Sequence, residues 1–105
     1  MSLTLPMLQI LLALVDEDRH GYGILLDIEK RTDGTRLGTG TLYTAIQRLL
    51  TKGLIEQAED RPRRELDDAR RRYYRLTDEG RKAAELEASK LQRVVGMARE
   101  KELLT

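Results

Sequence analysis

The sequence predicts a mainly α (α+β) fold in which amphipathic helices form most of the core. Apolar residues between Leu42 and Leu50 recur at helical spacing. A Lys-Gly stop and two short β-prone runs follow, and an arginine-rich segment separates the two runs. The last stretch, about 25 residues long, has the pattern of one continuous helix. Helix, strand, basic turn, strand and helix in this order predict a winged helix-turn-helix with a long C-terminal helix.

The first helix is predicted from the apolar run 8–15. Pro6 fits its first turn, where no N–H is needed, and the acids at 16–18 return the chain to water. A run of eight residues is too short to cross a bilayer, and neither a basic region nor a small-residue cleavage site marks a signal peptide. The chain has no cysteine, which fits a reducing compartment. We therefore expect a cytoplasmic protein without a membrane segment.

The second helix is predicted to run from near His20-Gly21 to about Arg31. Three apolar residues should face inward and three charged residues outward; these are Ile24, Leu25 and Ile28, and Asp27, Glu29 and Lys30. His20 is the only histidine, so a metal site would lack the several ligands that it needs. We expect His20 to be a polar packing residue near the start of this helix.

The third helix carries an apolar stripe and, opposite it, the predicted reading face. The stripe consists of Leu42, Ile46, Leu49 and Leu50. No acid occurs from Arg36 to Ile55, and a carboxylate there would be repelled by DNA, which carries one negative charge per roughly 1.7 Å of axis. Four side chains are candidates for base readout in a major groove: Thr41, Thr44, Gln47 and Arg48. The alternative is a small helix with a weakly polar exposed face.

Lys52-Gly53 should end this helix, and strands are predicted to start at Leu54-Ile55 and to cover Arg72 to Leu76. Positions 61–75 hold seven arginines against three acids, a net charge of +4, whereas the whole chain is +1. Concentrated charge beside a reading helix suits DNA backbone contacts. The candidates for such contacts are Thr39, Tyr43, Lys52, Arg61, Arg63, Arg64 and Arg72. The alternative is a solvated hairpin tip whose charges bind nothing specific.

The final helix should begin after Thr77, whose hydroxyl can cap it. At 1.5 Å per residue it would extend roughly 38 Å, too far for a small domain to cover its apolar line. A second copy would cover it, and two-fold pairing also supplies two reading helices for half-sites about 34 Å apart or a multiple of that. The predicted dimerisation residues are Leu86, Leu91, Val94, Val95, Met97 and Ala98. The alternative is a helix that folds back on its own domain.

Three segments in this order and spacing, HGYGILLDIEKRT, GTLYTAIQRLLTKGLI and RRYYRLTDEGRK, resemble the PadR family of bacterial transcriptional regulators. The resemblance extends from about Leu5 to the C-terminus. It implies a winged helix DNA-binding domain at 1–77, a dimerisation helix at 78–105, and a homodimeric repressor of a palindromic operator. Some members release DNA on binding planar aromatic compounds, so a hydrophobic small-molecule effector is a further expectation. Gly38-Thr39 precedes the GTLY motif where Ser-Pro or similar residues are expected, which leaves the helix start open by a residue or two.

Enzymatic functions find no support in the sequence. There is no Gly-rich phosphate loop followed by Lys-Ser or Lys-Thr, and no nucleophile with a plausible base. We therefore expect no catalytic residue, cofactor or metal. The remaining alternative to a DNA-binding regulator is a winged helix that serves as a protein interaction module. The acid-free face and the localised arginines favour double-stranded DNA as the partner.

Overall fold

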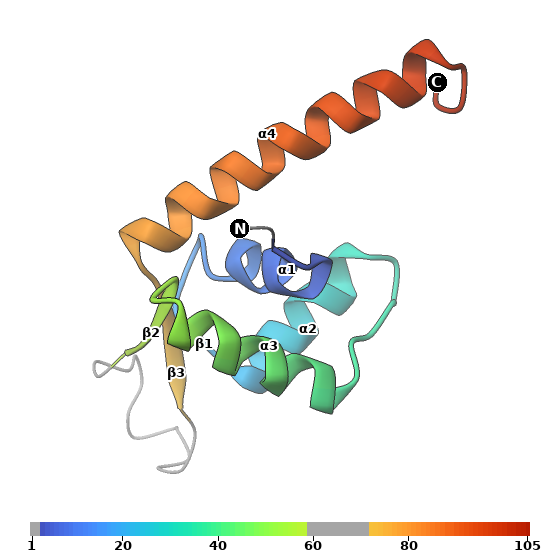
Figure 1. Ribbon diagram of the computed structural model, residues 1–105. Coiled ribbons are helices and arrows are strands. Elements are labelled where there is room, and N and C mark those ends of the chain that lie inside the picture. Colours follow the sequence, from blue (N-terminus) through green and yellow to red (C-terminus); the bar gives the residue numbers. More distant parts are fainter. Residues whose placement is uncertain (1–2, 59–71) are drawn as a thin grey trace.

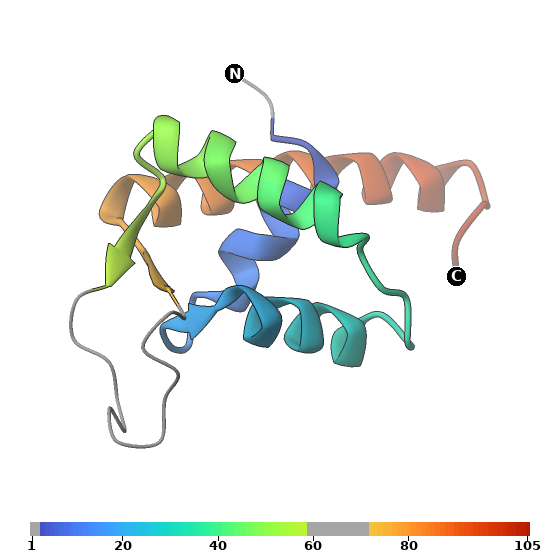
Figure 2. The same cartoon turned by 90° about the horizontal axis from the view of Figure 1, so that it is seen from below.

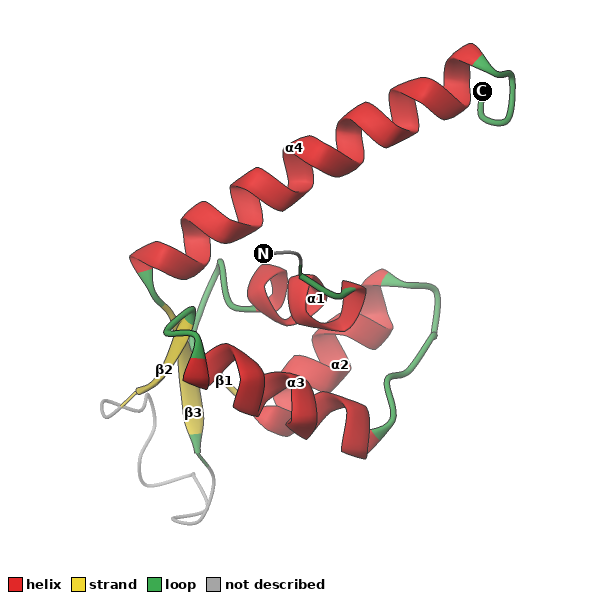
Figure 3. Cartoon of the chain, viewed as in Figure 1, coloured by secondary structure: helices red, strands yellow, loops and turns green. Residues whose placement is uncertain are grey.

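The computed structural model describes residues 3–58 and 72–105, which form four helices and a small antiparallel sheet (Figure 1, Figure 3). This confirms the predicted α+β winged helix fold. In chain order the elements are α1 (Leu5–Ala13), β1 (Arg19–His20), α2 (Gly21–Arg31), α3 (Thr39–Thr51), β2 (Ile55–Ala58), β3 (Tyr73–Leu76) and α4 (Asp78–Glu100).

Side chains cap three of the four described helices. Thr4, His20 and Thr77 each accept a hydrogen bond from the backbone N–H three residues later, at 3.3, 3.0 and 3.0 Å. His20 therefore has the polar role expected of it, with Nδ1 as the acceptor. The helix whose start was open, α3, begins at Thr39 after Gly38 and has no side-chain cap.

The end of α3 shows why the chain turns sharply from this helix into the sheet. Gly53 has φ of +73°, the left-handed conformation that glycine adopts without a Cβ penalty. Its N–H donates to the Leu50 carbonyl at 3.1 Å, and the Leu54 N–H donates to the Leu49 carbonyl at 3.0 Å. These two bonds form a Schellman motif. The predicted Lys52-Gly53 stop is confirmed.

The sheet has the order β1-β3-β2, with both neighbouring pairs antiparallel. The β2–β3 pair, in which Ile55 lies opposite Leu76, confirms the two predicted strands within one residue at each start. The two-residue strand β1, whose His20 lies opposite Tyr73, was not predicted. Two residues are too short to show the alternation by which a strand is recognised. Through β1 the sheet is joined directly to the start of α2.

The core lies around α1, which packs against α2, α3 and α4 (Figure 1, Figure 2). Of the predicted α3 stripe, Leu42, Ile46 and Leu49 are buried, whereas Leu50 is only partly covered. The inward stripe of α2 is buried as predicted. The largest fully buried side chains are Ile10, Leu11, Ile24, Leu42, Ile46, Leu49 and Ile55.

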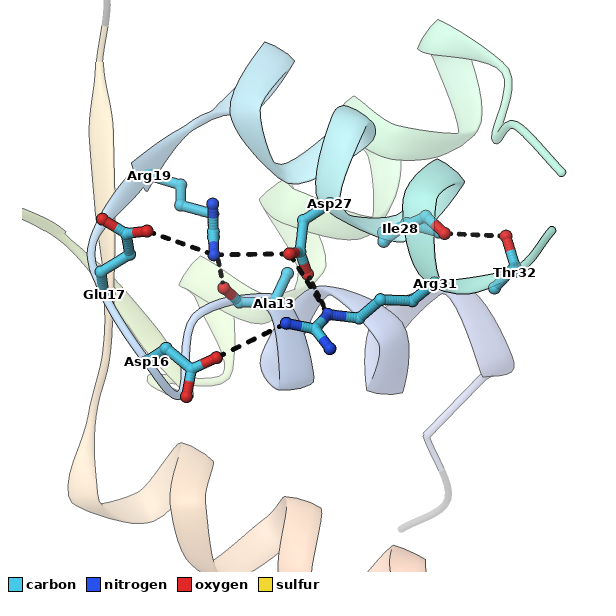
Figure 4. A network of polar contacts seen from close by, with 8 residues as sticks. All are labelled: Ala13, Asp16, Glu17, Arg19, Asp27, Ile28, Arg31 and Thr32. Atoms are coloured by element: carbon cyan, nitrogen blue, oxygen red, sulfur yellow. Dashed lines mark hydrogen bonds and ion pairs between the residues drawn. The ribbon is translucent and has the colours of Figure 1, made fainter. Parts of the chain in front are cut away.

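One outward prediction on α2 is wrong. The Asp27 side chain is only 8% exposed and lies between two arginines (Figure 4). Arg31 Nε lies 3.2 Å from it, and an Arg19 guanidinium nitrogen lies 3.4 Å from it. Arg19 Nε also donates to the Ala13 carbonyl at 2.7 Å. Buried charges in proteins are paired in this way because an isolated one is costly. The network ties the end of α1, strand β1 and α2 together.

The long helix α4 belongs partly to the core and partly projects from it. Gly80 and Ala84 are buried, and Ala84 belongs to the main hydrophobic cluster. The C-terminal half extends past α1, so that the described chain is 53 Å along its longest axis (Figure 1). The division at 77/78 stays a prediction, since the first turns of α4 pack on the preceding elements. No helix among the described residues is long and apolar enough to cross a membrane.

Candidate nucleic-acid interface

The outer face of α3 is exposed along its whole length. All four candidates for base readout, Thr41, Thr44, Gln47 and Arg48, are exposed, while Leu42, Ile46 and Leu49 on the opposite side are buried. The helix has 13 residues, so the face is about 20 Å long at 1.5 Å per residue. An exposed helix face of this length can lie in a major groove, which is about 12 Å wide.

A shallow depression of about 390 Å³ runs between this face and the start of α1. Thr41, Thr44 and Arg48 line one side, and Thr4 and Pro6 line the other. Gln47 is exposed outside the depression. The structure therefore groups three of the four candidates and adds the beginning of α1, which the sequence analysis did not connect with this face. Only the packing of α1 on α3 brings these segments together.

The ion pairs of the described residues leave Arg48 available to a partner. Arg19 and Arg31 are paired with Asp27, and Arg36 Nε lies 2.6 Å from the Glu29 carboxylate. The hydrogen bond and charge of Glu29 raise the pKa of Arg36. The Arg48 side chain is exposed and makes no hydrogen bond or ion pair within the described ranges. It is thus a cation on the acid-free face whose five donors are unoccupied.

The arginines of the predicted basic segment do not all have the same role. Arg75 donates to Asp18 Oδ2 from Nε at 3.2 Å and from a terminal nitrogen at 2.9 Å. Arg75 thus connects β3 to the segment before β1. From the sequence it was counted among the cations available to DNA, and its pairing with Asp18 corrects that count. Arg72 is exposed next to β3. Arg61, Arg63 and Arg64 lie outside the described residues.

Tyr43 extends from the flank of α3 towards α2 and the sheet. Tyr43 is 46% exposed, and its hydroxyl lies over Gly21 at the start of α2. Burial raises the pKa of Tyr74 in β3, and the nearby Tyr43 adds to this effect. Thr39 and Lys52, the other candidates for backbone contacts on α3, are exposed at its two ends. The residues of α3 that are predicted to contact the DNA backbone therefore lie at the two ends and on the flank of its exposed face.

The predicted dimerisation face of α4 is largely uncovered in the single chain. Leu86, Leu91, Val94 and Met97 are 60, 42, 57 and 61% exposed, and Val95 and Ala98 are partly exposed. On α1, Leu5 and Leu12 are 63% and 50% exposed. The described residues contain no cluster of three or more histidine, cysteine, aspartate or glutamate side chains that could hold a metal ion.

Comparison with known proteins identifies the family. The Transcriptional regulator PadR-like family matches residues 10–86. An uncharacterized 37.1 kDa protein in transposon TN4556 of Streptomyces fradiae is 39% identical over 87 residues; the match covers 83% of this chain and only 23% of that protein. Two solved structures are also similar. A transcriptional regulator from Clostridium thermocellum has a TM-score of 0.78 at 28% identity, over 90% of this chain and 87% of its own. A PadR family transcription regulator from Clostridium difficile R20291 has a TM-score of 0.79 at 26% identity, over 92% and 97%. The chain belongs to the PadR-like family of transcriptional regulators.

Proposed function

We propose that this chain binds double-stranded DNA as a homodimer and represses transcription from a palindromic operator. The observation that carries the proposal is the exposed, acid-free face of α3, which offers amide, hydroxyl and guanidinium groups. Arg48 suits bidentate bonding to guanine, and Gln47 suits bidentate bonding to adenine. Thr41 and Thr44 can bond to either base or contact a thymine methyl group.

Contacts to the DNA backbone would set the register and much of the affinity. Tyr43 and Thr39 would bond to phosphates from the flank and start of α3, and Lys52 from its end. Arg72 is exposed on the strand side of the same region. Arg61, Arg63 and Arg64 are proposed for the same role on the basis of sequence alone. Loss of one such cation should lower the salt slope by about 1, because fewer counterions are released.

The exposed apolar surface of α4 supports the homodimer. Four large side chains that are 42% to 61% exposed follow one another on a helix of 23 residues. Pairing with a second copy would bury them, and the exposed leucines of α1, which packs against α4, offer further apolar area. A two-fold arrangement would give two reading helices, so the operator should be palindromic with half-sites about 34 Å apart or a multiple of that.

A hydrophobic small-molecule effector that relieves repression remains part of the proposal. It would bind at the dimer surface of α4, where Leu91, Val94, Val95 and Met97 are the nearest apolar side chains. The chain has neither tryptophan nor phenylalanine, so a flat aromatic ligand would have no such ring to stack on. As a DNA-binding regulator the protein would act in the cytoplasm.

The test is selection of bound sequences from random duplex DNA by the purified protein at about 150 mM salt, where non-specific attraction is weakened. We expect an enriched palindrome. Enrichment of a single half-site would contradict the homodimer but would still support sequence-specific DNA binding. No enrichment by folded protein would contradict sequence-specific binding and favour the protein interaction module, for which a pull-down is the next experiment.

A further inference from the structure

Gly21, the first residue of α2, is in unusually close contact with Tyr43 of α3. A Cβ atom at position 21 would lie 2.5 Å from the Tyr43 hydroxyl oxygen, 3.0 Å from Cζ and 3.2 Å from Cε1. Real Cβ atoms essentially never approach another atom within 3.0 Å. The end of the phenol ring therefore occupies the space that any larger residue would fill.

The backbone at Gly21 does not explain the glycine. Among the described glycines only Gly34 and Gly53 have positive φ, so alanine could adopt the conformation of Gly21. Gly23, two residues further along α2, has space for a methyl group, since a Cβ there would meet its nearest neighbour at 3.5 Å. The steric requirement is specific to position 21 and comes from Tyr43.

The surroundings of Gly21 are held firmly. His20 precedes it, pairs with Tyr73 across the sheet, and caps α2 through Nδ1. The rings of His20 and Tyr73 meet edge to face, with centroids 5.2 Å apart. These contacts fix the backbone position of Gly21. The side chain of Tyr43, which is otherwise about half exposed, packs against it.

We propose that Gly21 is a positioning residue for DNA binding: it keeps the Tyr43 phenol in the conformation that presents its hydroxyl to the DNA backbone. The inference rests on the proposed function and adds a residue that need not touch DNA. With a side chain at position 21, the ring has to turn away, and its exposure allows it to do so without unfolding the domain. Binding is then weakened while the fold remains.

The experiment compares Gly21→Ala with Gly23→Ala, a matched glycine in the same helix turn. Tyr43→Phe and the double variant Gly21→Ala/Tyr43→Phe complete a cycle. We expect Gly21→Ala and Tyr43→Phe each to weaken binding to the selected operator on the order of tenfold, the value of a lost hydrogen bond to a charged group. The double variant should bind no more weakly than Tyr43→Phe, and Gly23→Ala should bind as the parent protein does.

Two readouts separate positioning from general damage. The salt slope of binding should be unchanged in Gly21→Ala, because a neutral phenol releases no counterion. In the free protein, the Tyr43 ring resonances should shift in Gly21→Ala and stay in place in Gly23→Ala. Additive losses in the cycle, or parental affinity of Gly21→Ala, would overturn the proposal. If the parent protein binds no DNA, the proposed function fails; unshifted Tyr43 resonances in Gly21→Ala would independently refute the contact itself.

Discussion

Replacement of Gly80 by alanine should destabilise the fold, because α4 starts in direct backbone contact with the α3–β2 turn. A Cβ at Gly80 would lie 1.9 Å from the Leu54 carbonyl oxygen and 2.8 Å from Leu76 Cδ1. The first of these neighbours is backbone and cannot turn away. The same Leu54 carbonyl accepts the Thr77 N–H at 3.2 Å, so moving α4 aside also disturbs this bond.

The cost follows from three contributions. Overpacking costs about 1–3 kcal/mol, and the weakened hydrogen bonds at Thr77 cost about 0.5–1.5 kcal/mol each. The hydroxyl of Thr77 donates to the Gly53 carbonyl at 2.8 Å and is exposed to the same shift. Alanine regains about 0.5–1 kcal/mol over glycine in a helix. We expect a net loss of about 3 kcal/mol in the free energy of unfolding, the sum of these central values with both Thr77 hydrogen bonds counted.

Urea unfolding followed by circular dichroism measures this loss. With an m-value of about 1–3 kcal/mol/M, the midpoint should fall by roughly 1–3 M. Gly40→Ala is the control, since a Cβ at Gly40 meets nothing within 4 Å; Gly96 is less suitable because it lies beside the proposed dimer surface. An unchanged or higher midpoint for Gly80→Ala would show that the turn yields easily and would refute the reasoning.

Three further outcomes are expected. Arg48→Ala should lose about 1–3 kcal/mol on the selected operator and little on random DNA, whereas Arg72→Ala should weaken binding to both and lower the salt slope; equal losses on both DNAs for Arg48→Ala in competition binding would remove it from the reading set. Val94→Glu should convert the proposed dimer to a monomer in sedimentation equilibrium, while Leu26→Glu, at a 41% exposed leucine of α2 outside the proposed interface, should not. The raised pKa of Tyr74 means that the unfolded chain releases this proton first, so stability should be complete below about pH 10 and fall as the pH rises through the folded-state value. Tyr74→Phe should remove that fall in urea titrations, and an equally steep fall in this variant would assign it to another group.

Elements that depend on neighbouring residues could be predicted from the sequence. The α3 stripe follows from spacing alone, and the Lys52-Gly53 stop follows from the conformational freedom of glycine. The Thr77 cap, followed by the acids Asp78 and Glu79 in the first turn, marks the start of α4. Each of these signals lies within a few residues of the feature that it predicts. The candidate reading face was correctly placed on the exposed side for the same reason.

Features that depend on distant residues could not be predicted. Asp27 was predicted to face solvent because the pattern of its own helix shows only that position 27 is charged. Its partner Arg19 lies on another element, β1. Arg75 counts as an available cation until its pairing with Asp18, 57 residues away, is known. The contact between Gly21 and Tyr43 likewise appears only when α2 and α3 are packed. The local sequence around a side chain does not show which charged group or which space lies next to that side chain in the folded protein.

The distribution of these pairs explains how a chain with a net charge of only +1 can offer a surface suited to DNA. Arg19, Arg31, Arg36 and Arg75 are bound to carboxylates of α2 and of the segment 16–18, where they hold the helices and the sheet together. The carboxylates that pair with these four arginines therefore serve the scaffold, and no acid lies on α3. Removal of a scaffold pair and removal of Arg48 should consequently have separable effects: the first on the free energy of unfolding, the second on the choice of DNA sequence. A near-neutral overall charge should also limit attraction to random DNA, so that the contacts proposed for α3 would decide where the protein binds.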